Sequence, residues 1–160
     1  MISFLRNIIR LKSVKSLLII ILSITVMSFT IWQTDFEKAK QIAKENHQLI
    51  LLNFSGSDWC GPCMRMRKEI FDDKLFLSMA DTNLVLINAD FPRNKKNKLD
   101  AISTKKNEAL ADEYNPDGKF PLTLLLNADG KIIKTWDGLP NETAKQLAQQ
   151  IKIICDGNRK

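Results

Sequence analysis

Apolar and polar positions alternate in distinct blocks along the part of the chain that follows residue 33. Short continuous apolar runs are typical of central strands covered on both faces, whereas apolar residues recurring every three or four positions indicate helices. Together the blocks predict the order helix, strand, helix, strand, helix, strand, strand, helix, which is that of an α/β domain. The predicted strands cover residues 49–54, 83–89, 122–126 and 131–136.

Local signals mark the expected ends of the helices. Thr34-x-x-Glu37 has the form of a capping box, so a first helix is expected from there to about Asn46. The last helix is expected between an Asn141 cap and Gly157. Its apolar stripe is predicted to be buried and consists of Ala144, Leu147, Ala148, Ile151, Ile154 and Cys155.

A longer helical pattern runs from Gly61 to about Ala80, and Asp72-Asp73 is expected to divide it into two helices. Its apolar positions are predicted to face inward, with methionines among them either packing in the core or forming an adaptable substrate surface. These inward positions are Met64, Ile70, Phe71, Leu75, Phe76 and Met79. A further short helix is expected over 108–114.

The connections predict how the strands pair. A strand, a helix and a second strand in sequence form a right-handed parallel crossover, and the turn at 127–130 predicts an antiparallel edge strand. Residues 91–107 are polar and rich in lysine, and we interpret them as an exposed loop inserted between a strand and a helix. A site for a polyanion or an acidic partner is the alternative there.

The N-terminal 33 residues are unlike the rest of the chain. Residues 1–16 are basic and contain no acid, and residues 17–32 are apolar, interrupted only by serine and threonine. We interpret 1–33 as a targeting segment and 34–160 as the folded domain. An uncleaved anchor in the inner membrane is favoured over a cleaved signal peptide, and either places the domain in the periplasm of a bacterium.

The formal net charge of +6 arises from two local clusters. Residues 1–33 carry +4 and residues 93–106 carry +5, so the remainder is net negative. A basic charge that is confined in this way does not indicate nucleic-acid binding.

Chemistry is concentrated in Trp59-Cys60-Gly61-Pro62-Cys63, between a predicted strand and a predicted helix. The first N–H groups of a helix have no partner within the helix, and the helix dipole adds positive charge there. A thiolate at Cys60 would be stabilised by both, so its pKa should fall. Pro62 suits an early helical position, and Cys63 lies about one turn on, where it can attack a mixed disulfide formed by Cys60.

The cysteine pair has two alternative interpretations. A tetrahedral zinc site needs four ligands, and the chain offers only Cys155 and His47 besides the pair, each of them isolated. A reduced pair without chemistry is the second alternative, against which Gly61-Pro62 between the cysteines argues. Cys155 itself is expected to be a small buried hydrophobic residue. No metal and no cofactor are therefore expected.

The five residues of this motif resemble the active site of the thioredoxin family, and the resemblance extends from about Thr34 to the C-terminus. It implies a thioredoxin fold, with a mixed central sheet of about four strands between helices. It also implies that Pro121, preceded by Phe120, is a cis proline beside the cysteine pair, where the adjoining backbone pairs with substrate. Trp59, Gly61, Pro62, Phe120 and Pro121 are then the substrate-binding candidates, and Cys60 and Cys63 the catalytic ones.

The chain departs from the family pattern at three places. Asn53 stands where thioredoxins have a buried aspartate that assists proton transfer to the resolving cysteine, and Leu86 replaces the neighbouring lysine. Phe120 replaces a small or β-branched residue before the proline. Asp58 is near in sequence but expected to be exposed, and it ranks low as a substitute acid. The proton acceptor for Cys63 is thus left open.

The resemblance implies a thiol–disulfide oxidoreductase that acts on client proteins with disulfides or thiols. Gly-Pro between the cysteines is similar to the reducing thioredoxins, whose potential is about −270 mV, so a reducing or isomerising direction is expected, with electrons from a membrane partner. Two alternatives remain: a non-catalytic thioredoxin-fold chaperone or adaptor, and a component that keeps thiols reduced for cytochrome maturation.

Overall fold

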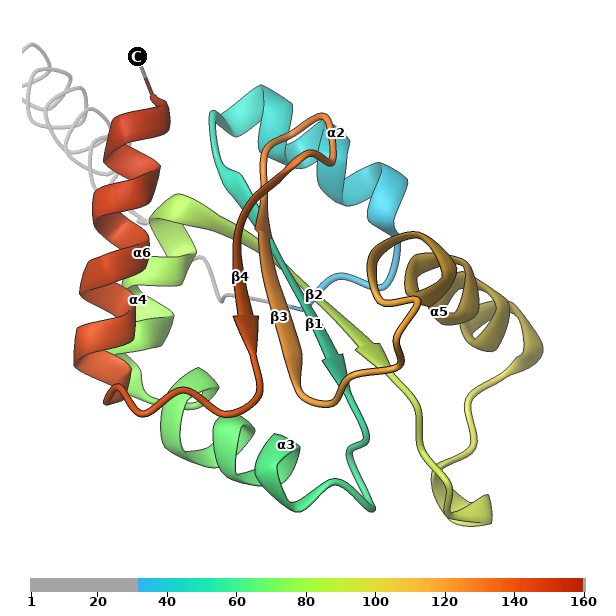
Figure 1. Ribbon diagram of the computed structural model, residues 1–160. Helices are drawn as coiled ribbons and strands as arrows, with labels where there is room; N and C mark the ends of the chain where they lie inside the picture. The colour runs from blue at the N-terminus through green and yellow to red at the C-terminus, as the bar shows by residue number, and fades with distance from the viewer. Residues whose placement is uncertain (1–31, 160) are drawn as a thin grey trace, which may run out of the picture.

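A computed structural model describes residues 32–159 of the chain and shows one mixed sheet between two layers of helices (Figure 1). The strand order is β2-β1-β3-β4. β1 pairs in parallel with β2 and antiparallel with β3, which pairs antiparallel with β4, as the connections predicted. The strands are β1 (Leu49–Ser55), β2 (Leu84–Asp90), β3 (Leu122–Leu126) and β4 (Ile132–Asp137).

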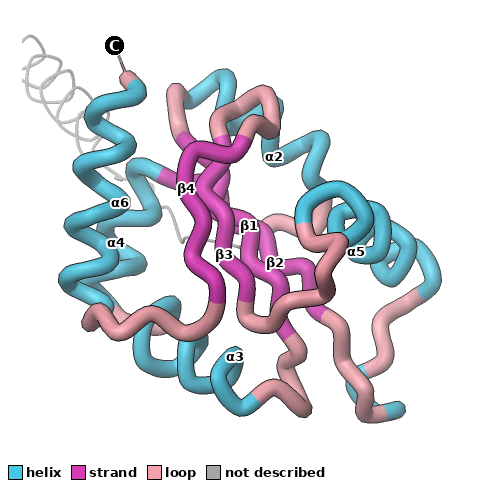
Figure 2. Tube along the Cα trace, in the orientation of Figure 1, coloured by secondary structure: helices cyan, strands magenta, loops and turns pink. Residues whose placement is uncertain are grey.

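The helices cover both faces of the sheet (Figure 2). On one face α4 packs against α6, and on the other lie α2 and α5. α3 leads into a π-helical turn, Arg67–Phe71, below the end of β1, and a short 3-10 turn follows β2 at Lys95–Asn97. The helices are α2 (Phe36–Asn46), α3 (Gly61–Met66), α4 (Lys74–Asn83), α5 (Ala101–Tyr114) and α6 (Ala144–Asn158).

β1 is the centre of the domain, because all seven of its residues are buried. Its side chains alternate between two hydrophobic cores: Leu49 and Leu51 face α4 and α6, whereas Ile50, Leu52 and Phe54 face α2 and α5. This is the arrangement that a continuous apolar strand predicts for a sheet covered on both sides.

Two predicted helix caps are wrong by one or two residues. Asp35, not Thr34, caps α2, because its carboxylate accepts a hydrogen bond from the Lys38 N–H at 3.0 Å. Thr143, not Asn141, caps α6 and forms a reciprocal capping box with Gln146. In both cases a second capping residue lies close by in sequence, and the structure uses the one nearer to the first buried position of the helix.

The lysine-rich stretch 91–107 was predicted to be a loop, and this is wrong for its last seven residues, which belong to α5. α5 begins at Ala101 because the Asp100 carboxylate accepts hydrogen bonds from the N–H groups of Ile102 and Ser103, both at 2.9 Å. Only Leu110 of α5 is fully buried. A helix with so little apolar surface has weak periodicity, which is why its first two turns were not recognised.

Two apolar residues predicted to face inward are exposed instead. Met64 is 46% exposed and Leu75 is 56% exposed. Met64 lines a pocket together with Cys63, and Leu75 is the second residue of α4, after the Asp73 cap and Lys74. Ile70, Phe71 and Phe76 are buried as predicted.

The predicted targeting segment lies almost wholly outside the described residues, so it stays a prediction. Of its last two residues, Trp32 packs edge-on against Phe71 with ring centroids 5.3 Å apart, and Gln33 forms a parallel bridge with Ile87. Among residues 32–159, no helix combines the length and the apolar character that a membrane crossing needs.

The burial of α6 generates a stability prediction with a matched control. Ile151 is fully buried, whereas Ile153 on the same helix is 66% exposed. Ile151→Ala should lower the free energy of unfolding by about 2–5 kcal/mol, because it leaves a cavity in the core. Ile153→Ala should change it by no more than about 0.5 kcal/mol. Urea denaturation measures both, and equal losses would contradict this packing.

Candidate active site

The two cysteines lie where β1 ends and α3 begins. Cys60 is the N-cap of α3 and is joined to Cys63 by a disulfide, with their Cα atoms 5.2 Å apart. The Cys63 N–H points at Cys60 Sγ, 3.2 Å away. Each cysteine is only 5% exposed, while Gly61 and Pro62 between them are exposed. The helix start thus directs an N–H donor at the Cys60 sulfur, as the sequence predicted.

Trp59 is held in place on three sides. Its indole N–H donates to the Phe91 carbonyl at 2.6 Å, and its ring packs edge-on against Phe120 with centroids 5.4 Å apart. The guanidinium of Arg93 lies over the same ring, 3.7 Å from its centroid. Gly56 lies against the indole so closely that a Cβ there would overlap it. The ring is therefore a fixed wall of the site.

Asp58 connects the loop after β2 to the cysteine turn, which is the segment 56–60 between β1 and α3. Its carboxylate accepts hydrogen bonds from the N–H groups of Arg93 at 2.9 Å and Asn94 at 2.8 Å, and from the Asn97 amide at 3.0 Å. These donors, the Arg93 N–H first among them, lower the pKa of Asp58. The side chain was predicted to be exposed and ranked low as a substitute acid; it is partly buried and connects two loops.

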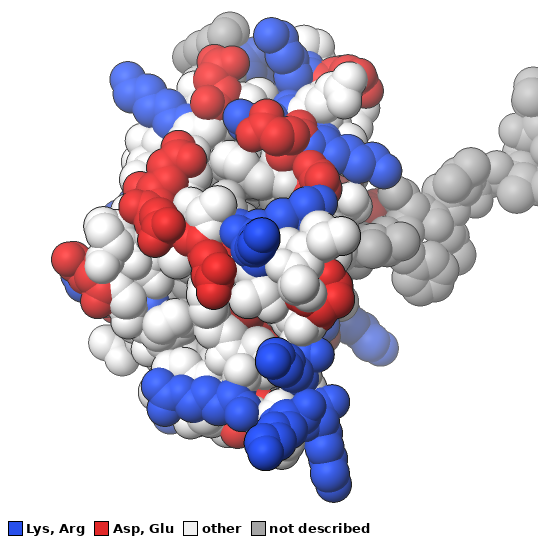
Figure 3. All heavy atoms as spheres, turned by 90° about the vertical axis from the view of Figure 1, so that its right-hand side faces the viewer, with Lys and Arg blue, Asp and Glu red and all other residues white. Residues whose placement is uncertain are grey.

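A groove opens between these loops on the Trp59 side of the cysteine pair. It has a volume of about 410 Å³, and its lining includes Trp59, Phe91, Phe120, Arg93 and Lys98. Lysine and arginine side chains gather at the lower end of this face of the molecule, below α5 (Figure 3), where the loop carries Lys95 and Lys96 as well. The groove thus combines aromatic walls with a basic rim.

The peptide bond between Phe120 and Pro121 is cis, as the resemblance implied. Pro121 is buried and directly precedes β3, whose first residue Leu122 pairs with Phe54 at the end of β1. The pairing places Pro121 at the end of the sheet where β1 leads into the cysteine turn. Phe120 also packs edge-on against Phe91, so it closes the aromatic wall of the groove.

Asn53 is buried, and both ends of its side-chain amide are hydrogen-bonded. Its amide N–H donates to Asn88 Oδ1 at 2.7 Å, and its Oδ1 accepts from the Thr123 hydroxyl at 2.9 Å. All three side chains come from neighbouring strands and lie on the face of the sheet that carries α3. A polar network therefore stands where the family pattern has a single acid.

Further polar residues, which sequence reasoning missed, continue this network to the surface. The Ser55 hydroxyl is within hydrogen-bond distance of Asn88 Oδ1 and Asp90 Oδ1, at 3.1 and 3.0 Å. Ser57 donates to Asp90 through its N–H at 2.9 Å and its hydroxyl at 2.6 Å. The available signal was a period of two: Asn53 and Ser55 alternate on β1 as Asn88 and Asp90 do on β2.

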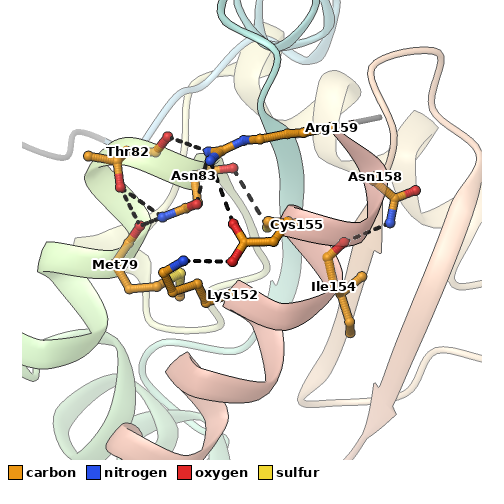
Figure 4. Close-up of polar contacts among 9 residues, drawn as sticks. Met79, Thr82, Asn83, Lys152, Ile154, Cys155, Asn158 and Arg159 are labelled. Carbon is orange, nitrogen blue, oxygen red and sulfur yellow. Dashed lines mark hydrogen bonds and ion pairs between the residues drawn. The ribbon is translucent and has the colours of Figure 1, made fainter.

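Cys155 is not part of the site. It is 2% exposed in α6, and its Sγ lies 3.9 Å from the Asn83 carbonyl (Figure 4). Burial raises the pKa of its thiol to about 11. Arg159 and Asn83 close the end of the helix above it through a hydrogen bond of 2.9 Å. The expectation of a small buried hydrophobic residue is confirmed.

Within the described residues, no three or more histidine, cysteine, aspartate or glutamate side chains come together as a metal site. What the arrangement offers chemically is a cysteine pair, here as a disulfide, that directly follows Trp59 in the wall of an aromatic groove. Such a pair can exchange disulfides with another thiol or disulfide that reaches the groove.

The model of the thioredoxin-like domain family matches residues 36–152 of the chain. Among curated proteins, the chain is 33% identical over 100 residues to the disulfide bond reductase DsbH of Chlamydia pneumoniae, covering 62% of this chain and 58% of DsbH. It is 28% identical over 128 residues to the thioredoxin-related protein DsbJ of the same organism, covering 80% of this chain and 36% of DsbJ. The matches thus span little more than half of one relative and about a third of the other.

Solved structures agree with the fold. A structure of a DsbH oxidoreductase superposes with a TM-score of 0.71 at 26% identity, covering 80% of this chain and 85% of that one. A thioredoxin from Thermus thermophilus superposes with a TM-score of 0.60 at 13% identity, covering 82% of this chain and 91% of that one. At this low identity the second likeness shows the fold alone.

The contact between Gly56 and Trp59 can be tested directly. Gly56→Ala should push the indole away from Phe91, because the added Cβ overlaps the ring. The indole N–H resonance of Trp59 should shift in a ¹H–¹⁵N NMR spectrum as its hydrogen bond to the Phe91 carbonyl is lost. Gly157→Ala is the control, since a Cβ there meets no other atom within 4 Å. An unchanged Trp59 resonance in Gly56→Ala would contradict the described contact.

The raised pKa of Cys155 predicts that its thiol is inert in the folded protein. In the oxidised chain it is the one free cysteine. With a pKa of about 11, only about one thiol in a thousand is ionised at about pH 8. Iodoacetamide should therefore leave Cys155 unmodified in the native state and alkylate it readily in urea, as mass spectrometry would show. Equal alkylation in both states would refute its burial.

Proposed function

The chain belongs to the thioredoxin-like domain family, and from that premise we propose that it is a thiol–disulfide oxidoreductase that acts on disulfides of other proteins through Cys60 and Cys63. The observation that carries the proposal is the position of the pair: Cys60 caps a helix and receives the Cys63 N–H at its sulfur. An N–H donor and the helix dipole both stabilise a thiolate, which is the attacking species in disulfide exchange.

In the reducing direction the reaction has two steps. The Cys60 thiolate attacks one sulfur of a client disulfide, forms a mixed disulfide with the client and releases the other client sulfur as a thiolate, which takes up a proton. Cys63 then loses its proton and attacks Cys60 Sγ, which releases the second client thiol and leaves the Cys60–Cys63 disulfide. A separate electron donor must return this disulfide to the dithiol.

Residues around the pair would bind the client. Trp59 and Phe120 offer a rigid aromatic surface, and Gly61 and Pro62, which connect the two cysteines, are exposed. The backbone beside the cis Pro121 is proposed to pair with an extended client segment, as in other thioredoxin-like proteins. Phe120 narrows this approach, so we expect the groove to favour clients with small residues next to the cysteine.

A reducing or isomerising role at the periplasmic face of the inner membrane is the form of the proposal we favour. Gly61-Pro62 is the connection of reducing thioredoxins, and one relative is named a disulfide bond reductase. The basic and apolar N-terminal segment supports an anchor facing the periplasm, with a membrane protein as electron donor. A measured potential above about −150 mV would overturn the reducing assignment.

Activity of single-cysteine variants tests the proposal. Cys60→Ser should abolish the reduction of insulin by dithiothreitol-regenerated protein, because the attacking sulfur is gone. Cys63→Ala should accumulate mixed disulfides with clients, which can be isolated and identified; cytochrome-maturation proteins among them would favour that branch. Cys155→Ser should retain the wild-type rate, since Cys155 is remote and buried. Equal rates for Cys60→Ser and wild type would favour a non-catalytic chaperone or adaptor.

A further inference from the structure

The resolving cysteine, Cys63, needs a proton acceptor. Asn53, which stands where the family has a buried aspartate, cannot accept this proton. Asn53 is 5% exposed, and an amide takes up no proton at neutral pH. Both ends of that amide are already committed, one to Asn88 and the other to Thr123. The proton that Cys63 loses in the second step therefore passes to water or to another group. This inference rests on the proposed function.

The structure contains a route away from Cys63. A pocket of about 190 Å³ is lined by Cys63 together with the polar side chains of Asn53, Ser55, Ser57 and Asn88. A water molecule occupies about 30 Å³ in the liquid, so the pocket has room for several. These polar side chains offer hydrogen-bond partners to water, although Trp32, Met64 and Phe71 line the same pocket. Water in the pocket would bring a proton from the sulfur to the serine hydroxyls.

The two serine hydroxyls share one acceptor beyond the pocket. Ser55 Oγ lies 3.0 Å from Asp90 Oδ1, and Ser57 Oγ lies 2.6 Å from Asp90 Oδ2. A hydroxyl that donates to a carboxylate can accept a proton from water on its other side while passing its own proton on. β1 and β2 set this geometry, because Ser55 and Asp90 are paired across the parallel register.

The other charged groups around this route are cations, or an acid that is already bound. Arg67 and Lys68 line the same pocket from the helical side, and Arg93 and Lys98 line the groove that Asp90 borders from the loop side. The nearest other acid on the cysteine turn, Asp58, is bound by three donors of the loop after β2. Lysine and arginine are protonated at neutral pH and cannot take a proton. Asp90 is the carboxylate that the Ser55 and Ser57 hydroxyls of the pocket contact.

We propose that Asp90 is the proton acceptor for Cys63, acting through the hydroxyls of Ser55 and Ser57 and water in the pocket. As the Cys63 S–H bond breaks, its proton enters this chain and Asp90 becomes a neutral carboxylic acid. The Cys63 thiolate forms the bond to Cys60 Sγ while the bond from Cys60 to the client sulfur breaks. The client leaves as a thiolate, and Asp90 returns its proton to the solvent. Asp90 at the end of β2 thus takes the role that one buried acid has in the family pattern.

Reaction of the reduced chain with one equivalent of dithionitrobenzoate separates the two steps. The first coloured thionitrobenzoate is released when Cys60 attacks, and the second when Cys63 resolves the mixed disulfide. Cys155→Ala serves as the background, so that the pair supplies the only thiols. Stopped-flow records of both phases are compared for Asp90→Asn, Asp90→Glu and Asp129→Asn, the last being an exposed acid on the hairpin turn.

In Asp90→Asn, the second phase should slow by about tenfold or more near pH 6.5, the lower end expected of general-base assistance. The deficit should close near pH 9, because a thiol with a pKa of about 8.5 then ionises unaided. The first phase should stay unchanged, Asp90→Glu should recover much of the rate, and Asp129→Asn should match the background.

Three results would overturn the assignment. The second phase of Asp90→Asn could match the background at every pH. It could slow equally at every pH together with the first phase, which would indicate a merely structural role. Or Asp90→Glu could be as slow as Asp90→Asn. A background chain that releases no thionitrobenzoate from Cys60 would instead refute the proposed function itself, so the two failures are distinguishable.

Discussion

The structure depends on the register of one buried strand. β1 lies between β2 and β3, and all seven of its residues are buried. A shift of one residue would move every side chain of β1 to the opposite core, so the hydrophobic alternation holds the register firmly. That register pairs Ser55 with Asp90 on one side and Phe54 with Leu122 on the other. The cysteine turn, Asp90 and Pro121 therefore lie together at the end of the sheet where β1 and β2 finish and β3 begins.

The loops at this end of the sheet contact one another. Asp58 binds the backbone of the loop after β2, and Trp59 receives the Arg93 guanidinium on its ring. Both contacts connect the cysteine turn to a segment more than thirty residues later in sequence. This fastening pre-organises the groove wall, so a client would lose less freedom of the protein when it binds. The same contacts leave Gly61 and Pro62 exposed for the reaction.

Much of the fold followed from the sequence, because its strands are strongly apolar and its helices mostly amphipathic. β1 and β3 were predicted almost to the residue, and the Cys60–Cys63 pair was placed at a helix start. What failed were features with little hydrophobic signal. The first turns of α5 bury almost nothing, and the cap of α6 had two candidate residues. The Asp90 network could not be assigned because it depends on which residues face each other across strands, which the sequence pattern alone does not state.

The account rests on an ionised, reactive sulfur at Cys60, and the most direct measurement is the pH dependence of its alkylation in the reduced chain. Iodoacetamide rates, followed peptide by peptide with mass spectrometry, give the pH at which half of the Cys60 thiol is ionised. The account predicts a midpoint well below the value of about 8.5 for free cysteine, because the helix start and the Cys63 N–H stabilise the thiolate. A midpoint at or above that value would contradict it.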